Sequence, residues 1–279
     1  MNASYKLLVL LMAVAILPAA TGATYLSITG PVTANLTNGG GIYLGKVGPG
    51  ESFYVSASAT TANSSGSIIN IGWDRLEAVS LPAGWSSQPS LLYENPMKMK
   101  ITASPNAPYG SYNITLRAVN VGNYSRLGNL TFTAEVNVSS NVFLLNVAPT
   151  QLSAGVGQPV NLMITINNTG ISDDPFVINV HGIPAWNLQY SAISLHSTQN
   201  TFLYPVYVNV PGVYVFNLTV NSSTSAEVSK SYPISMTVSA SLSNDYSAIS
   251  QGVAITPVIY EPAYAVMSLV NYISSLLSR

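Results

Sequence analysis

The chain has 279 residues, a formal net charge of −1, a sequence pI of about 6.1 and no cysteine. Charged residues make up only 7% of it, against about 25% in an ordinary soluble domain, while 48% are hydrophobic and the mean hydropathy is +0.33. No basic cluster can neutralise phosphates, which argues against nucleic acid as a partner. The lack of cysteine excludes disulfides, thiolate metal sites and a cysteine nucleophile. A polar surface of Ser, Thr, Asn and Tyr suits an acidic environment or a cover of glycans.

The N-terminus has the organisation of a secretory signal peptide. Lys6 precedes the apolar run 7–17, and Pro18 and the small residues 19–23 follow. A charged region, a short apolar core and a small-residue exit are typical of a cleaved signal, so residues 1–23 predict an extracellular address. The alternative is an uncleaved N-terminal anchor, although the apolar run is shorter than the usual twenty residues of a membrane span.

From Thr24 to about residue 240, short apolar–polar alternations separated by Gly, Pro, Asn and Ser predict antiparallel strands. Helical periodicity is nearly absent there, so we expect no parallel sheet, which would need helical crossovers. Strands are predicted in the first half at 52–57, 97–102, 112–117 and 130–136, and in the second half at 160–166, 201–210, 213–220 and 232–238.

The chain also repeats itself. Leu81-Pro82-Ala83-Gly84-Trp85 is answered by Ile183-Pro184-Ala185-Trp186, and Tyr109-Gly110-Ser111-Tyr112 by Pro211-Gly212-Val213-Tyr214, with the matching Pro and Gly 102 residues apart in both cases. That period fits an immunoglobulin-like domain. We therefore predict an all-β chain of two tandem immunoglobulin-like antiparallel β-sandwiches, 24–140 and 141–240, with an N-terminal signal helix and a C-terminal amphipathic helix. A short linker near 139–141 predicts a semi-rigid rod. Each unit can bury its own core, so no cofactor is needed for folding.

Three segments resemble known immunoglobulin-like families. The run 155–160 leading to 164–170, the corner 81–85 and the strand entry 107–116 are similar to the alpha-galactosidase-associated and cell-adhesion-related domains of secreted, archaeal-type surface proteins. The resemblance covers residues 24 to about 240. It implies an immunoglobulin-like fold and carries no activity, because catalysis in such proteins usually belongs to other modules.

Two pairs of aromatic residues recur at matching positions. Tyr112 and Tyr214 each follow a Gly by two residues at a strand entry, where an immunoglobulin-like Tyr caps the sheet corner through its hydroxyl; an ordinary half-buried strand Tyr is the alternative. Trp85 and Trp186 each end a Pro-containing corner, and the repetition favours core packing over carbohydrate stacking.

Few residues suggest catalysis or metal binding. His181 and His196 have no third ligand at a suitable spacing, so two loop or edge histidines are expected rather than a metal pair. Asp173-Asp174 lacks the alternating ligands of a calcium loop and predicts a solvated turn. Glycosidases need two facing carboxylates, and no pair is predicted to meet among Glu51, Asp74, Glu77, Glu94, Glu135, Glu227, Asp245 and Glu261. No catalytic elbow or phosphate-binding loop occurs. We therefore expect a non-enzyme without catalytic, metal or cofactor-binding residues.

The chain is rich in Asn-x-Ser/Thr triplets, which predict glycosylation that would shield strand edges. After the signal region these triplets begin at Asn35, Asn63, Asn113, Asn123, Asn129, Asn137, Asn167, Asn217 and Asn221.

The C-terminal segment 241–279 is predicted to end in an amphipathic helix that begins near Pro262, because apolar residues recur at helical spacing. These residues form a predicted membrane or partner face at Val266, Leu269, Val270, Ile273, Leu276 and Leu277. The serine-rich opposite side favours an interfacial or partner-packing helix; a short membrane anchor and docking onto the chain's own sandwich remain open.

Together these features predict a non-catalytic extracellular structural or adhesion protein, membrane-associated or at the cell surface. The expected partners are cell-envelope proteins or membrane through the C-terminal helix, and surface glycans, but no nucleic acid. The alternatives are a carbohydrate-binding module and an accessory subunit of a secreted enzyme system. Exposed aromatics in a planar row would favour carbohydrate binding, and aromatics buried in two cores would not.

Overall fold

The structure is a computed structural model that describes residues 24–62, 68–121, 127–183 and 190–240, together with Val270 and Ile273. Strands occupy most of the described residues, so the predicted all-β class is confirmed. The signal segment and nearly all of the C-terminal segment lie outside them. Val270 and Ile273 are helical and exposed. No helix within the described ranges has both the length and the apolar character to cross a bilayer.

Period-two alternation explains why these residues form strands. In β9 (Met97–Thr102) Met97, Met99 and Ile101 are buried, whereas the two intervening lysines point outward. Strand β4 (Ser52–Ala57) pairs with β9 in a register that places Phe53 opposite Ile101. The two strands therefore present one continuous apolar face to the core.

The N-terminal unit consists of two sheets and a hairpin. One sheet has the order β2-β1-β4-β9-β8, the other β3-β11-β10-β7, and β5 and β6 pair separately. Besides β4 and β9, the strands are β1 (Leu26–Gly30), β2 (Ala34–Leu36), β3 (Gly41–Val47), β5 (Thr60–Ala62), β6 (Ile68–Gly72), β7 (Arg75–Ser80), β8 (Ser86–Gln88), β10 (Gly110–Val119) and β11 (Leu130–Val138).

The C-terminal unit also has two sheets, with the orders β12-β14-β17 and β13-β19-β18-β15-β16. Its strands are β12 (Phe143–Ala148), β13 (Gln151–Gly155), β14 (Val160–Asn168), β15 (Asp174–His181), β16 (Tyr190–Ser194), β17 (Gln199–Val206), β18 (Gly212–Ser222) and β19 (Ser229–Ser239). Seven of the eight predicted strand segments coincide with strands or fall within them. The segment 201–210 was predicted too long, because β14 begins at Val160 opposite Val206 and offers no partner beyond it.

The strand order is that of an immunoglobulin-like domain, in which the first strand is shared between the two sheets. In each unit an early strand joins the other sheet and pairs in parallel with the last strand: β3, which follows β1 and β2, pairs with β11, and β13, which follows β12, pairs with β19. The expectation of purely antiparallel pairing was therefore wrong at these two edges. No helical crossover is needed, because nearly the whole unit lies between the two parallel partners in sequence.

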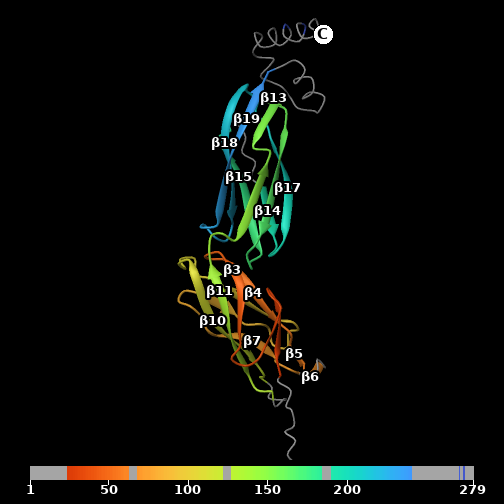
Figure 1. The fold of residues 1–279 in the computed structure, drawn as a ribbon, viewed down its shortest axis with the longest axis vertical. Coiled ribbons are helices and arrows are strands. Elements are labelled where there is room, and N and C mark those ends of the chain that lie inside the picture. The colour runs from red at the N-terminus through yellow and green to blue at the C-terminus, as the bar shows by residue number, and fades with distance from the viewer. Residues whose placement is uncertain are drawn as a thin grey trace, which may run out of the picture.

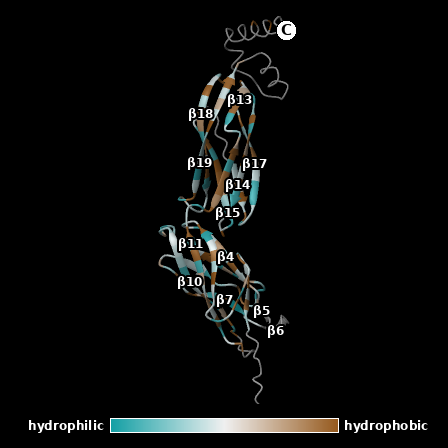
Figure 2. Cartoon of the chain, in the orientation of Figure 1, coloured by the Kyte–Doolittle hydropathy of each residue, from teal (hydrophilic) through white to brown (hydrophobic). Residues whose placement is uncertain are grey.

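Each unit has a separate hydrophobic core between its two sheets. The two units are stacked end to end, with the β3–β4 side of the first facing the β14–β15 side of the second (Figure 1). Hydrophobic and hydrophilic residues alternate along the strands of both units (Figure 2). The joint between the units is the place where residues from distant parts of the chain converge.

Candidate functional site at the joint between the units

The loop between β14 and β15 is shaped by a buried amide. The Asn168 side chain donates hydrogen bonds to the carbonyls of Ser172 (2.9 Å) and Ser194 (3.0 Å), and its carbonyl oxygen accepts one from the Gly170 amide (3.0 Å). Both N–H donors of this side chain and its carbonyl oxygen are thus engaged, which ties the turn to the end of β16. The turn thereby projects Ile171 away from its own unit.

Ile171 inserts into the first unit. Its side chain is 7% exposed and packs within the core cluster of residues 26–138 rather than that of its own unit. Its amide donates to the Lys46 carbonyl (2.9 Å), and the neighbouring Ser172 hydroxyl donates to the Ser52 carbonyl (2.7 Å). A Cβ on Gly45, which has a φ of 131°, would lie 2.6 Å from the Ile171 side chain. Because Gly45 has no side chain, the Ile171 side chain, the knob of the joint, can pack directly against the backbone there.

Two carboxyl groups from different units meet beside this knob. Glu51 is 0% exposed and Asp174 is 1% exposed. The Glu51 Oε2 atom accepts from the Gly48 amide (2.8 Å), and the Asp174 Oδ1 atom accepts from the hydroxyls of Ser222 and Thr224 (both 2.9 Å). The other oxygen of each carboxyl, Glu51 Oε1 and Asp174 Oδ2, is buried with no donor in reach among the described residues.

Burial dominates the electrostatics of this acid pair. The pKa of Glu51 is raised to about 7, chiefly by desolvation; the Gly48 amide opposes the rise, and the nearby Asp174 adds to it. Burial also raises the pKa of Asp174, although its two hydroxyl donors and Glu51 oppose the rise. Asp174 is better supplied with donors, so its anion is the more stable and the proton resides on Glu51.

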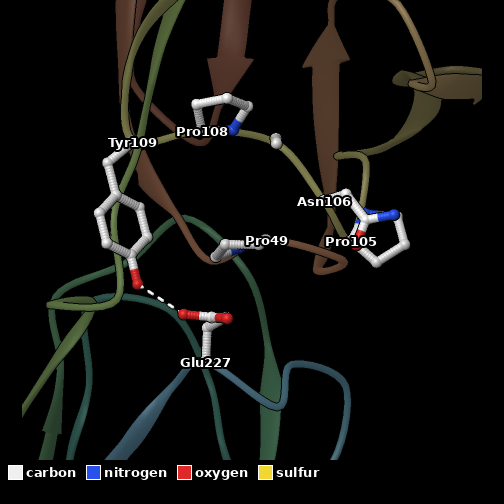
Figure 3. Close-up of a pocket in the computed structure, with 7 residues that line it drawn as sticks. Pro49, Pro105, Asn106, Pro108, Tyr109 and Glu227 are labelled. Atoms are coloured by element: carbon white, nitrogen blue, oxygen red, sulfur yellow. Dashed lines mark hydrogen bonds between the residues drawn. The ribbon is translucent and has the colours of Figure 1, made fainter.

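A cleft opens beside the acid pair. Its volume is 340 Å³, and its lining consists of Pro49, Pro105, Asn106, Ala107, Pro108, Tyr109 and Glu227. Tyr109 comes from the first unit and Glu227 from the second, and the Tyr109 hydroxyl donates to a Glu227 carboxylate oxygen at 2.9 Å across the joint (Figure 3). The lining has one carboxylate, whereas glycoside hydrolysis uses two.

The linker is fixed at both ends. The Ser139 amide donates to the Val47 carbonyl in the first unit (2.9 Å). On the other side Lys230 donates to the Asn141 side chain (3.0 Å) and lies 5.3 Å from the centre of the Phe143 ring. Burial lowers the pKa of Lys230. The linker therefore has bonded contacts to both units.

The two histidines do not form a metal site. His181 ends β15 and is exposed, whereas His196 lies beside Asp173 near the other end of that strand, with 2.7 Å between Nδ1 and the carboxylate. The eight residues of β15 make seven steps along the strand, so its two ends are about 23 Å apart. Within the described ranges, no group of three or more metal-ligating side chains gathers.

One prediction about carboxylates was wrong. Asp173 is half-exposed as a turn residue should be, but Asp174 is buried, because β15 begins there and its side chain faces the other unit. No pair was predicted to meet among Glu51 and seven other acidic residues, and the carboxylate that Glu51 meets, Asp174, is not one of those seven. The pairing arises only because the units are stacked.

The tyrosine corners are confirmed in both units. The Tyr112 hydroxyl donates to the Pro108 carbonyl (2.8 Å) and the Tyr214 hydroxyl to the Val210 carbonyl (2.9 Å), each four residues upstream. Trp85 is buried against Tyr112, with ring centroids 5.5 Å apart, so its core position is also confirmed. Trp186 lies outside the described residues.

Glycosylation stays a prediction. None of the described sequon asparagines is buried, which leaves their side chains available to modification; these are Asn35, Asn113, Asn129, Asn137, Asn167, Asn217 and Asn221. Asn63 and Asn123 lie outside the described residues. Of the predicted C-terminal face, Val266, Leu269, Leu276 and Leu277 also lie outside them, while Val270 and Ile273 are exposed.

A repeated turn in the sequence indicates that Glu51 is unusual. The turn Gly48-Pro49-Gly50-Glu51 recurs as Gly155-Val156-Gly157-Gln158, and in both the fourth side chain accepts from the first amide, at 2.8 and 3.1 Å. The first turn has an acid where the second has an amide. That difference marks Glu51 as a residue with a further role.

No family model and no curated protein matches the chain. Among solved structures, a chimeric titin Z1Z2 carrying a decorin peptide is 17% identical over 79% of this chain and 98% of its own, with a TM-score of 0.35. The Yersinia pseudotuberculosis adhesin InvE is 11% identical over 78% of this chain and 61% of its own, with a TM-score of 0.26. A Listeria innocua beta-glucosidase is 11% identical over 35% of this chain and 16% of its own, with a TM-score of 0.26. The resemblance to the alpha-galactosidase-associated and cell-adhesion-related families stays a prediction.

Proposed function

We propose that the chain is a non-catalytic extracellular structural or adhesion protein, in which two tandem immunoglobulin-like sandwiches form a stalk held at the cell envelope by the C-terminal segment 241–279. The observation that carries this proposal is the joint. Ile171 of the second unit completes the core of the first, and a stalk that transmits force needs its units fixed to one another in this way.

The distribution of charge supports the same function. Residues 141–240 contain four Asp, Glu, Lys or Arg side chains, Asp173, Asp174, Glu227 and Lys230, and all four belong to the end of the unit that faces its neighbour. The outer faces of the sheets in that unit combine Ser, Thr and Asn with exposed apolar side chains such as Leu144, Leu203 and Val215. Such faces change little with pH or salt, which suits an extracellular setting.

The positions of the aromatic residues favour a structural protein over a carbohydrate-binding module. The two described tryptophans, Trp73 and Trp85, are buried in the first core. Tyr43 and Tyr54 are exposed but lie on β3 and β4, which belong to opposite sheets. A flat sugar-stacking platform needs its rings in a row on one face.

The test of envelope attachment compares the full chain with a form that ends at Ser241, both expressed in cells of the source organism. After a salt wash we expect the full chain to stay with the membrane fraction and the shortened chain to be released. Release of both forms would refute attachment through the C-terminal segment. The shortened chain keeps both units, so a thermal melt that matches the full chain shows that the segment and not misfolding causes release.

A second candidate function is glycan binding in the 340 Å³ cleft, because a tyrosine and a carboxylate face each other there. A glycan array probed with the native chain and with Tyr109→Phe and Tyr109→Ala tests it. Binding that survives in the phenylalanine variant and is lost in the alanine variant would support ring stacking. No binding by the native chain would exclude this candidate.

A further inference from the structure

The acid pair at the joint lacks a compensating cation. The pKa values of Glu51 and Asp174 are shifted by burial, by their hydrogen bonds and by each other, with no contribution from a Lys, Arg or His among the described residues. The other titratable groups at the joint have partners or point away: Asp173 binds His196, Glu227 binds Tyr109, Lys230 binds Asn141, and the Lys46 side chain is exposed. Two buried carboxylates without a cation cannot both be charged at close range.

The local turn does not require an acid at this position. Gln158 makes the same side-chain bond in the equivalent turn of the second unit, at the far end from the joint. Gly50 and Gly157 also have similar φ values, 81° and 70°. An amide therefore satisfies the turn as well as a carboxyl does, and the carboxyl of Glu51 is explained by what it faces across the joint.

We propose that the joint is a proton-binding site: Glu51 and Asp174 share one proton between the two units, and loss of that proton drives the carboxylates apart and loosens the joint. The proton leaves Glu51 for solvent, and opening of the joint also weakens the bonds that Ile171 and Ser172 make to the first unit. Each unit stays folded, because each has a complete strand set, and among the described residues Ile171 is the single residue of the second unit in the core cluster of the first. The stalk is stiff in acid and flexible in alkali.

The direction follows from linkage. The pKa of Glu51 is about 7 in the closed joint and near its ordinary value of 4.5 once exposed. Protonation of Glu51 therefore stabilises the closed joint in full below a pH of 4.5, and this contribution is gone above a pH of about 7. The ratio of closed to open joints should therefore fall about tenfold per pH unit between these values, by about 300-fold in total.

The chain has no cysteine, so a pair of introduced cysteines can be spin-labelled without background. Thr133 on β11 and Thr237 on β19 are exposed and lie in different units. The distance distribution between the two labels is measured by pulsed electron paramagnetic resonance at pH 4.5 and pH 8.5, with EDTA present so that no divalent cation bridges the carboxylates. We expect a narrow distribution at pH 4.5 and a broad one at pH 8.5.

Two locked variants complete the test. Glu51→Gln supplies a permanent donor to Asp174, and Asp174→Asn supplies one to Glu51 while still accepting from Ser222 and Thr224. We expect both to give narrow distributions at both pH values. Gln158→Glu, far from the joint, is the control and should behave as the native chain. The proposal is overturned if the distance distribution of the native chain has equal widths at both pH values. It is also overturned if the distributions of both locked variants broaden at pH 8.5 while the variants are folded. If circular dichroism shows that one variant does not fold, the result of the other variant is used alone.

Discussion

Ile171→Ala measures how strongly one unit depends on the other. The substitution removes most of a side chain that is 7% exposed and lies in the core of the first unit. Large-to-small changes at buried isoleucines cost 2–5 kcal/mol. Because the vacated space lies between two units that can move together, we expect a loss near the lower limit, about 2–3 kcal/mol. It should appear in the first unit, although residue 171 belongs to the second.

Urea unfolding followed by tryptophan fluorescence measures this loss. Trp73 and Trp85 lie in the core of the first unit, and a Trp186→Phe background restricts the signal to them. Leu203→Ala is the matched control, because its side chain is 67% exposed on β17, and exposed substitutions change stability by less than about 0.5 kcal/mol. If Ile171→Ala destabilises the first unit no more than Leu203→Ala does, the inserted knob does not stabilise that unit and the argument for a rigid stalk fails.

Three other changes give independent tests. Tyr112→Phe and Tyr214→Phe each delete one hydrogen bond from a hydroxyl to a backbone carbonyl. Calorimetry should show that each variant lowers the unfolding free energy of its own unit by about 1 kcal/mol. Unequal losses would mean that the two corners are not equivalent. Gly48→Ala places a Cβ 2.6 Å from a Glu51 oxygen, so the label distances should broaden even at pH 4.5, and an unchanged narrow distribution would contradict the close packing. Hydrogen bonds from two arginines, chiefly Arg117, lower the pKa of Glu77, so this carboxylate stabilises the fold above its ordinary pKa and loses that effect as pH falls. Glu77→Gln should therefore reduce the free energy of unfolding at pH 7 and leave it unchanged at pH 2. An equal reduction at both pH values would exclude the ionic contribution.

Much of the architecture was predictable, because strands and turns are specified locally. The alternation Met97, Met99, Ile101 assigns one face to the core without knowledge of the partner strand. The repeated Gly-x-Tyr entry fixes both tyrosine corners, since donor and acceptor are only four residues apart. The strand pattern, the repeat and the corners therefore determined the all-β class and the immunoglobulin-like character.

The parallel edges of the sheets needed the tertiary structure. Strand β3 pairs with β11, and β13 pairs with β19, and in both cases almost a whole unit separates the partners. Period-two alternation reports which side of a strand is buried, but it does not report which strand lies alongside.

By itself the sequence determined that the chain folds as β-structure with an unusually uncharged surface, and it placed two equivalent turns at Gly48–Glu51 and Gly155–Gln158. Only the tertiary structure decided that Glu51 meets Asp174 and that Ile171 enters the other core. The physical reason is that a turn is fixed by hydrogen bonds among neighbours, whereas the joint depends on how two completed units pack. A carboxyl that appears to be an ordinary turn residue in the chain becomes a proton-binding group only when that packing removes it from water.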